Sequence, residues 1–288
     1  MSAARGIGGP GRESVGQALA RAVGRLRAAG VETPGTDARR LLTAALGIAP
    51  DRLTLQMPEP LPAAAAARFA GFIAARCRRQ PVAQILGERL FWGRRFRVTP
   101  DVLDPRPDTE TLVEAALAAP FVNVLDLGTG SGCILISLLA ERALAHGLGV
   151  DISEAALEIA RANAEALGVA ARAEFRKGDW CAGLSGPYDL IVSNPPYIAE
   201  DEMPALAPEL RVWEPRAALT PGGDGLDAYR RILAQAPALL SAGGRLMVEI
   251  GAGQGDAVAA LFEAAGLEGV KILKDIDGRP RVVAGRKP

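Results

Sequence analysis

Apolar residues recur every three or four positions between residues 15 and 26, and Gly30 then ends the pattern. The same spacing predicts a second helix that is capped by Thr36 and ended by Gly47. A third helix is expected from about Pro62 to Arg79, with the proline in its first turn. These segments predict a small helical bundle at the start of the chain.

The pattern changes after residue 80. Residues 91–98 end in a period-two alternation around a turn at Gly93, which predicts a short β-hairpin. From Thr109 onward short apolar runs alternate with amphipathic helices, as in a mostly parallel sheet covered on both faces. Only residues 274–280 separate the last two runs, so these strands should be antiparallel neighbours. The predicted strands are Asn123–Asp126, Leu148–Asp151, Ala173–Arg176, Leu190–Ser193, Arg245–Glu249, Val270–Leu273 and Arg281–Ala284.

We therefore expect an α/β protein with a Rossmann-like, mostly parallel seven-stranded sheet in its larger domain. The predicted parts are a disordered tail (1–11), an N-terminal helical domain (12–80), a β-hairpin linker (81–106) and the sheet domain (107–288). The tail is rich in glycine and has no apolar segment, so it does not resemble a signal peptide. No run approaches the ~18 apolar residues of a membrane span. A cytoplasmic protein is expected.

Charge is unevenly distributed along the chain. The 288 residues have a net charge of zero. Residues 1–80 contain 12 Arg, no Lys and 5 acidic residues, a balance of +7, which leaves −7 for the rest. An arginine-rich domain could face an acidic protein or RNA, although a solvated helix surface explains the same count.

Cysteine and histidine are too sparse for a metal site. Cys77, Cys133 and Cys181 form no closely spaced pair, and His146 is the only histidine. We expect His146 to be a loop residue before a strand. No protein-bound metal and no catalytic set built on His146 are expected.

A glycine-rich segment follows the first strand of the sheet domain. Glycines let a backbone turn tightly and approach a ligand closely. Asp151 ends the next strand, where an acid commonly binds the ribose hydroxyls of a nucleotide, although it could instead cap the following helix. After the third strand, Asp179 could accept a hydrogen bond from an adenine amino group and Trp180 could cover the ring. The glycine-rich segment is Asp126-Leu127-Gly128-Thr129-Gly130-Ser131-Gly132.

The spacing of these glycines distinguishes two adenosine-containing ligands. NAD normally requires G-x-G-x-x-G, with its pyrophosphate at the helix N-terminus. The chain has G-x-G-x-G, with Asp126 two residues before the first glycine. S-adenosylmethionine (SAM) has no pyrophosphate but has an ammonium group that an acid can attract. The segment therefore favours SAM.

Asn194-Pro195-Pro196-Tyr197 follows the fourth predicted strand. The prolines fix their own backbone and push Asn194 into an extended conformation. Such a rigid elbow can present a side-chain amide, main-chain carbonyls and an aromatic ring to a planar –NH₂ group. Taken alone, it could equally be a simple strand-to-loop turn.

With these two motifs the chain resembles class I SAM-dependent methyltransferases that modify amide or exocyclic amino nitrogens. More closely, it resembles the PrmC/HemK family, which methylates the side-chain amide nitrogen (N5) of a glutamine in the Gly-Gly-Gln motif of class 1 peptide chain release factors. The matching segments are Asp37–Leu42, Leu103–Glu110, Glu214-Pro215, Ala218-Leu219, Gly222–Leu226 and Glu249–Gly251. Gln84, Asp104 and Asp108 depart from the family pattern, and the first two leave the fine geometry of the hairpin open.

The resemblance implies a role for each motif. Asp126 and the residues Gly128, Thr129, Gly130, Ser131 and Gly132 would bind the methionine part of SAM. Asp151 would hold the ribose, and Asp179 and Trp180 the adenine. Asn194, Pro195, Pro196 and Tyr197 would bind the substrate glutamine, with Asn194, Pro195 and Tyr197 catalytic and Asn194 also bordering SAM. Substrate recognition would lie in the helical domain and in the long segment 198–227, and the enzyme would be a monomer.

Three other functions stay open. A nucleic-acid methyltransferase acting on adenine N6 or guanine N2 would need the same elbow, because a flipped base presents the same planar amine. The acidic sheet domain and the lack of an added target-recognition domain argue against direct nucleic-acid binding. A ribosomal-protein glutamine methyltransferase shares the same chemistry. A non-catalytic SAM-binding module is disfavoured by having both motifs intact.

Overall fold

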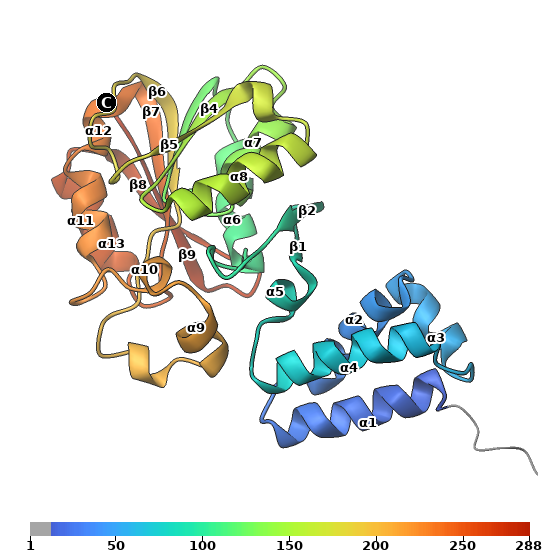
Figure 1. Ribbon diagram of the computed structural model, residues 1–288. Helices are drawn as coiled ribbons and strands as arrows, with labels where there is room; N and C mark the ends of the chain where they lie inside the picture. Colours follow the sequence, from blue (N-terminus) through green and yellow to red (C-terminus); the bar gives the residue numbers. More distant parts are fainter. Residues whose placement is uncertain (1–12) are drawn as a thin grey trace, which may run out of the picture. The chain divides into compact units, whose positions relative to one another are not determined.

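Amphipathic helices form the first part of the chain, which ends at Leu86. In the computed structural model, which describes residues 13–288, the chain divides into two units at Leu86 and Gly87 (Figure 1). The predicted tail 1–11 lies outside the described residues. The helices of the first unit are α1 (Val15–Ala28), α2 (Pro34–Leu46), α3 (Leu53–Gln56), α4 (Ala63–Cys77) and α5 (Val82–Leu86).

The core of this unit comes from the predicted apolar faces. Leu26 and Leu41 are fully buried, as is most of Phe69, whereas Phe72 is only half-buried. Within this core the Arg76 guanidinium donates to Asp37 Oδ2 at 2.7 Å. A buried charge requires such a partner, because its desolvation is otherwise uncompensated.

The start of α2 differs from the prediction. Thr36 is exposed and lies inside the helix, and the N-cap position is Thr33, because Pro34 already fits the first helical turn. Gly47 ends α2 with φ of 69°, as predicted. A side-chain cap is instead found at α1, where Ser14 Oγ accepts from Gln17 N and Gln17 Oε1 accepts from Ser14 N.

We expect Ser14→Ala to lower the free energy of unfolding by about 1 kcal/mol, because it removes a cap from α1. Thr36→Ala is the matched control. It removes a hydroxyl from a helix interior and should be neutral or stabilise by a few tenths of a kcal/mol. Urea denaturation of both variants measures the difference, and equal effects would contradict this assignment of the caps.

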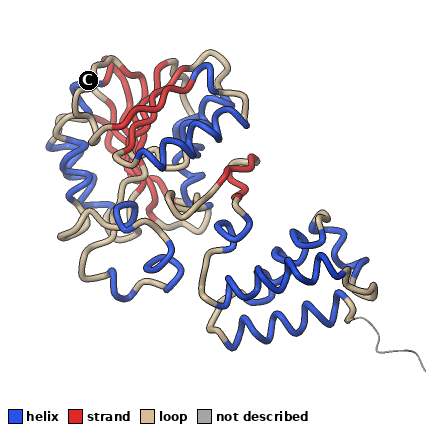
Figure 2. Tube along the Cα trace, viewed as in Figure 1, coloured by secondary structure: helices blue, strands red, loops and turns tan. Residues whose placement is uncertain are grey.

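The second unit is built around the predicted seven-stranded sheet, shown in red in Figure 2. Its order is β5-β4-β3-β6-β7-β9-β8. The central pairs are parallel, and β9 is antiparallel to both of its neighbours, as the short connection to β8 predicted. The strands are β3 (Asn123–Leu127), β4 (His146–Asp151), β5 (Ala173–Lys177), β6 (Tyr188–Ser193), β7 (Leu240–Glu249), β8 (Glu268–Lys274) and β9 (Pro280–Arg286). His146 therefore begins a strand and is not a loop residue.

Helices cover both faces of the sheet (Figures 1 and 2). One face is covered by α6 (Glu110–Leu117), α7 (Cys133–Glu141) and α8 (Glu154–Ala166). The other is covered by α11 (Asp227–Leu233), α12 (Ala236–Leu239) and α13 (Gly255–Ala264). The amphipathic pattern between the fourth and fifth predicted strands indicates one helix over residues 227–240, but the structure has two, because Pro237 lacks the N–H that a continuous helix would need.

The predicted hairpin consists of β1 (Glu88–Phe91) and β2 (Arg94–Arg97). Phe91 and Phe96 are buried in the core on the α6 side of the sheet. Asn163 of α8 pairs with the main chain of Arg97 in both directions, accepting from its N–H at 2.7 Å and donating to its carbonyl at 3.2 Å. The hairpin is therefore packed into the second unit.

Candidate active site

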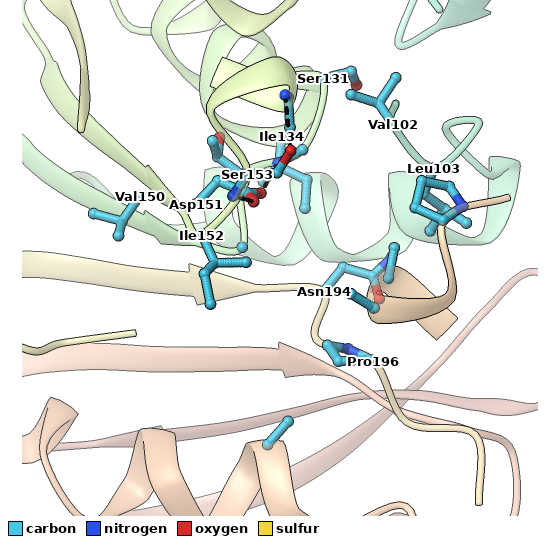
Figure 3. Close-up of a pocket in the computed structure, with 18 of the residues that line it drawn as sticks. Val102, Leu103, Ser131, Ile134, Val150, Asp151, Ile152, Ser153, Asn194 and Pro196 are labelled. Atoms are coloured by element: carbon cyan, nitrogen blue, oxygen red, sulfur yellow. Dashed lines mark hydrogen bonds between the residues drawn. The ribbon is translucent and has the colours of Figure 1, made fainter. Parts of the chain in front are cut away.

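The predicted site residues follow adjacent strands at the carboxyl edge of the sheet. Their order across the sheet is Asp179 after β5, Asp151 at the end of β4, the glycine-rich loop after β3 and Asn194 after β6. From β3 the chain adds β4 and β5 on one side of the sheet and then crosses to add β6 on the other side. Open α/β sheets bind ligands at such a reversal of strand order. A cavity of about 430 Å³ lies there. Figure 3 shows Asp151, Ser153, Asn194 and Pro196 around it.

The glycine-rich loop is held close to β4. The N–H groups of Gly128 and Thr129 both donate to the Val150 carbonyl, at 2.8 and 3.0 Å. Gly128, Gly130 and Gly132 all have positive φ, between 54° and 78°, which other residues adopt only with strain. Gly128, Thr129, Gly130 and Ser131 line the cavity, and Gly132 does not.

Asp126 lies beneath this loop and does not line the cavity. Its side chain is fully buried, and Oδ2 accepts from the Thr129 hydroxyl at 2.7 Å. Burial raises the pKa of Asp126 to about 7, against the hydrogen bond from Thr129, which lowers it. The predicted contact of Asp126 with a ligand stays a prediction, and the contact that the structure shows is with the loop itself.

Close packing, and not contact with the cavity, restricts position 132 to glycine. A methyl group there would lie 2.8 Å from Ile136 Cδ1 and 3.2 Å from Ala160 Cβ, in a backbone with φ of 78°. We expect Gly132→Ala to lower the free energy of unfolding by about 2–4 kcal/mol, combining overpacking with left-handed strain.

Gly168→Ala is the control for this substitution, because Gly168 has φ of 73° and open space around it. It should cost only about 1–2 kcal/mol, the strain alone. Chemical denaturation measures the free energy of unfolding of both variants. An equal loss would show that the contact with Ile136 adds no cost beyond the backbone strain.

Asp151 is positioned by two backbone donors. Its Oδ2 accepts from Gly130 N and its Oδ1 from Ser153 N, both at 2.9 Å. The cap of α8 is Ser153, whose hydroxyl accepts from Ala156 N. Each carboxylate oxygen has a second lone pair, so Asp151 can still accept from a ligand hydroxyl while it holds the loop.

Flat and apolar groups line the next part of the cavity. Trp180 has φ of 53° and places its ring against Gly128, within 3.5 Å of the position of an added Cβ. Asp179 is paired with Arg231 of α11, and both residues line the cavity. Ile152 also lines it while remaining 62% exposed. The sequence interpretation missed Ile152, because its exposure beside Asp151 becomes visible only in the structure.

The elbow after β6 is only partly turned toward the cavity. Asn194 and Pro196 line it, whereas Pro195 is buried and Tyr197 lies outside the lining. Tyr197 packs against the core on the α11 side of the sheet, and its carbonyl accepts from Gln254 Nε2 at 2.8 Å. The catalytic roles of Pro195 and Tyr197 stay predictions.

Two further segments complete the cavity wall. One includes Arg106 and Thr109, which were not among the predicted site residues, and the other follows Glu214, within the segment 198–227 that was predicted to recognise the substrate. Glu214 joins them, because its buried carboxylate accepts from Asp104 N at 3.2 Å and lies 3.4 Å from Arg106 Nη2. Burial raises the pKa of Glu214 to about 7, and the Arg106 charge opposes this rise. The long segment 198–227 contains three short helices, which are η4 (Met203–Ala205), α9 (Pro208–Trp213) and α10 (Arg216–Leu219).

Two of the departures from the family pattern have partners in the second unit. Asp104 is buried, and its Oδ1 lies 3.5 Å from Arg89 Nε in the hairpin. Asp108 pairs with Arg281 of β9 at 2.8 Å. Gln84 is buried in α5. Asp104 thus ties the hairpin to the segment that lines the cavity.

Among residues 13–288 no cluster of histidine, cysteine and acidic side chains could hold a metal ion. In the same range no helix is long and apolar enough to cross a membrane.

The sequence is similar to known proteins over most of its length. The release factor glutamine methyltransferase of Cereibacter sphaeroides is 64% identical over 271 residues, which cover 94% of this chain and 98% of that protein. The chain belongs to the release factor glutamine methyltransferase family. The protein of the same name in Rhodospirillum rubrum is 47% identical over 98% of the chain and 90% of its own length.

Two domain models match parts of the chain, and a solved structure shares its fold. Residues 17–87 match the PrmC N-terminal domain, and residues 105–225 match the methyltransferase small domain. A crystal structure of a methyltransferase from Pyrococcus furiosus covers 67% of this chain and 88% of its own, with a TM-score of 0.50 and 20% identity. At this identity the likeness shows the fold alone.

Proposed function

We propose that the protein transfers a methyl group from SAM to the N5 side-chain amide nitrogen of a glutamine in class 1 peptide chain release factors. One observation carries this proposal: Asn194 and the glycine-rich loop line the same cavity. A methyl donor held by the loop would have its substrate amine beside it. Membership of the release factor glutamine methyltransferase family supports the same reaction.

The residues that line the cavity fit SAM. Asp151 offers acceptors for the ribose hydroxyls, and Trp180 and Ile152 offer flat, apolar cover for adenine. The main chain of the loop from Gly128 to Ser131 can approach the methionine part closely, because its glycines have no side chain. A cavity of about 430 Å³ is within the range of small-molecule sites.

An amide nitrogen is a weak nucleophile because its lone pair is delocalised into the carbonyl. When bound, SAM supplies a methyl group activated by its sulfonium. The protein then has mainly to align the nitrogen with the methyl at about 3–3.5 Å, which is worth a large part of the barrier. In our proposal Asn194 Oδ1 and the Pro195 carbonyl accept the two amide hydrogens, and Tyr197 covers the amide plane. No strong base is needed, since the methylated amide loses its extra proton readily.

Recognition of the release factor is assigned to the helical unit and to segment 198–227. Segment 198–227 lines the cavity with Pro215, Ala218 and Thr220, so it lies where a protein substrate would enter. Residues 1–80 carry a balance of +7, which suits an acidic partner. Because the substrate acts in translation, we also propose a cytoplasmic location, and a monomer as the active form.

Methyl transfer from radiolabelled SAM tests the proposal. A purified release factor, ribosomal protein and total RNA are offered separately, each with and without RNase. We expect label only in the release factor, unaffected by RNase. RNase-sensitive label in RNA would favour a nucleic-acid methyltransferase, and label in ribosomal protein but not in the release factor would favour the related glutamine methyltransferase.

A further inference from the structure

A buried carboxylate lies next to Asn194 and has no place in the mechanism above. In the parallel pair of β6 and β7, Ser193 is opposite Val248, so Asn194 and Glu249 are the next residues at the same level. Glu249 is 1% exposed. Asn194 and Glu249 continue the strand positions of Val192 and Met247, which face the core on the α6 side. Thr109, at the start of α6, completes the group.

Thr109 contacts the Asn194 amide directly. The Asn194 Nδ2 group donates to Thr109 Oγ1 at 3.2 Å. Thr109 is 2% exposed, yet it is among the residues that line the cavity. A hydroxyl has a single hydrogen, so Thr109 can accept from Asn194 only while its own hydrogen points elsewhere.

Glu249 is the neighbouring group that can accept that hydrogen. Burial raises the pKa of Glu249 to about 7, and hydrogen bonds to the Thr109 and Asn194 side chains lower it. Oε2 of Glu249 is buried and has no hydrogen-bond partner among the described residues, so it is free to accept the Thr109 hydrogen. As a carboxylate, Glu249 can only accept, so it selects the hydroxyl orientation in which Thr109 accepts from Asn194 Nδ2.

We infer that Glu249 and Thr109 are positioning residues that hold the Asn194 amide with its oxygen directed to the substrate. This inference rests on the proposed function, in which that oxygen accepts a hydrogen from the glutamine amide. Without the pair the amide could turn over and present its own –NH₂ group, which would repel the substrate's –NH₂. The elbow therefore depends on residues from two distant parts of the sequence.

Protonation of Glu249 would weaken this control. A protonated carboxyl becomes a donor to Thr109, whose hydrogen can then turn to Asn194 Oδ1 and favour the reversed amide. The charged and titratable groups that interact electrostatically with Glu249 are Arg281 of β9, Asp108 before α6, Tyr197 after β6, Tyr229 of α11 and Cys133 of α7. Arg281 favours the carboxylate and Asp108 opposes it. The turnover of the wild type should fall as the pH decreases through about 7.

Two variants of Thr109 separate its hydroxyl from its shape. Thr109→Val keeps the volume and removes the hydroxyl, and we expect kcat to fall about 10- to 100-fold through misorientation of the amide. The KM for release factor and the Kd for SAM should stay within about twofold, since orientation affects the transition state more than binding. Thr109→Ser keeps the hydroxyl and should keep nearly all of the activity.

Glu249→Gln tests whether protonation of Glu249 causes the pH dependence of kcat. This variant cannot ionise, so the fall of kcat near pH 7 in the wild type should be absent from its pH profile. The inference is overturned if Thr109→Val keeps the wild-type kcat, if Thr109→Ser loses as much as Thr109→Val, or if Glu249→Gln keeps the same acidic limb. Should Thr109→Val fail to fold, the serine variant and the pH profile still decide. A wild type that leaves release factor unmethylated would instead refute the proposed function.

Discussion

Replacing Asn194 with alanine is expected to lower kcat about 10³-fold, the effect of removing one preorganised polar group from a reacting centre. Asn194 lines the cavity beside the glycine-rich loop, and its oxygen is the proposed acceptor for the glutamine amide. SAM binding should change little, because Asp151 and the loop remain. Isothermal titration with SAM and single-turnover methyl transfer to release factor measure the two effects separately.

Asn123→Ala is the matched control for this variant. Asn123 begins β3 at the opposite edge of the sheet and is exposed. The same change of side chain there should leave both SAM binding and kcat unaltered. A near-normal turnover in Asn194→Ala, with SAM bound normally, would contradict the proposed clamp.

Asp151→Ala should weaken SAM binding about 10³-fold, because two hydrogen bonds to a charged group are lost at about 1.5–3 kcal/mol each. The variant also removes the acceptor that holds Gly130 N, so the loop loses part of its support. Calorimetric titration with SAM measures the loss of affinity. At saturating SAM, kcat should recover much further than in Asn194→Ala.

Asp189→Ala provides the control for Asp151. Asp189 also accepts from two backbone N–H groups, those of Val122 and Asn123, but does so at the amino edge of the sheet. Its loss should affect stability without changing the Kd for SAM. Equal SAM affinity in Asp151→Ala and Asp189→Ala would contradict the ribose-binding role.

The parts of the fold that depend on local pattern were predictable from sequence. The apolar runs placed every strand of the sheet, and the short connection from residue 274 to 280 predicted the antiparallel pair at its edge. Thr36 was assigned wrongly as a cap because Pro34 had already begun α2. Pro237 lies in the first turn of α12 and interrupts the continuity with α11, but the helical spacing of the apolar residues around it predicted one continuous helix.

The site was predictable where its residues follow strands directly, as Asp151 and Asn194 do. Glu249 was part of a family segment, but nothing in its own surroundings marks it as a neighbour of Asn194. Their proximity comes from the register of β6 with β7, and Thr109 joins them only through the packing of α6. Contacts of this kind depend on tertiary structure and leave no local pattern.

Peptide mapping by mass spectrometry of a release factor incubated with the protein and SAM tests the central claim most directly. We predict one methyl group, on the side-chain nitrogen of the glutamine in the Gly-Gly-Gln motif, and none after incubation with Asn194→Ala. A release factor that stays unmodified while the protein binds SAM, or a methyl group on any other residue, would contradict the account.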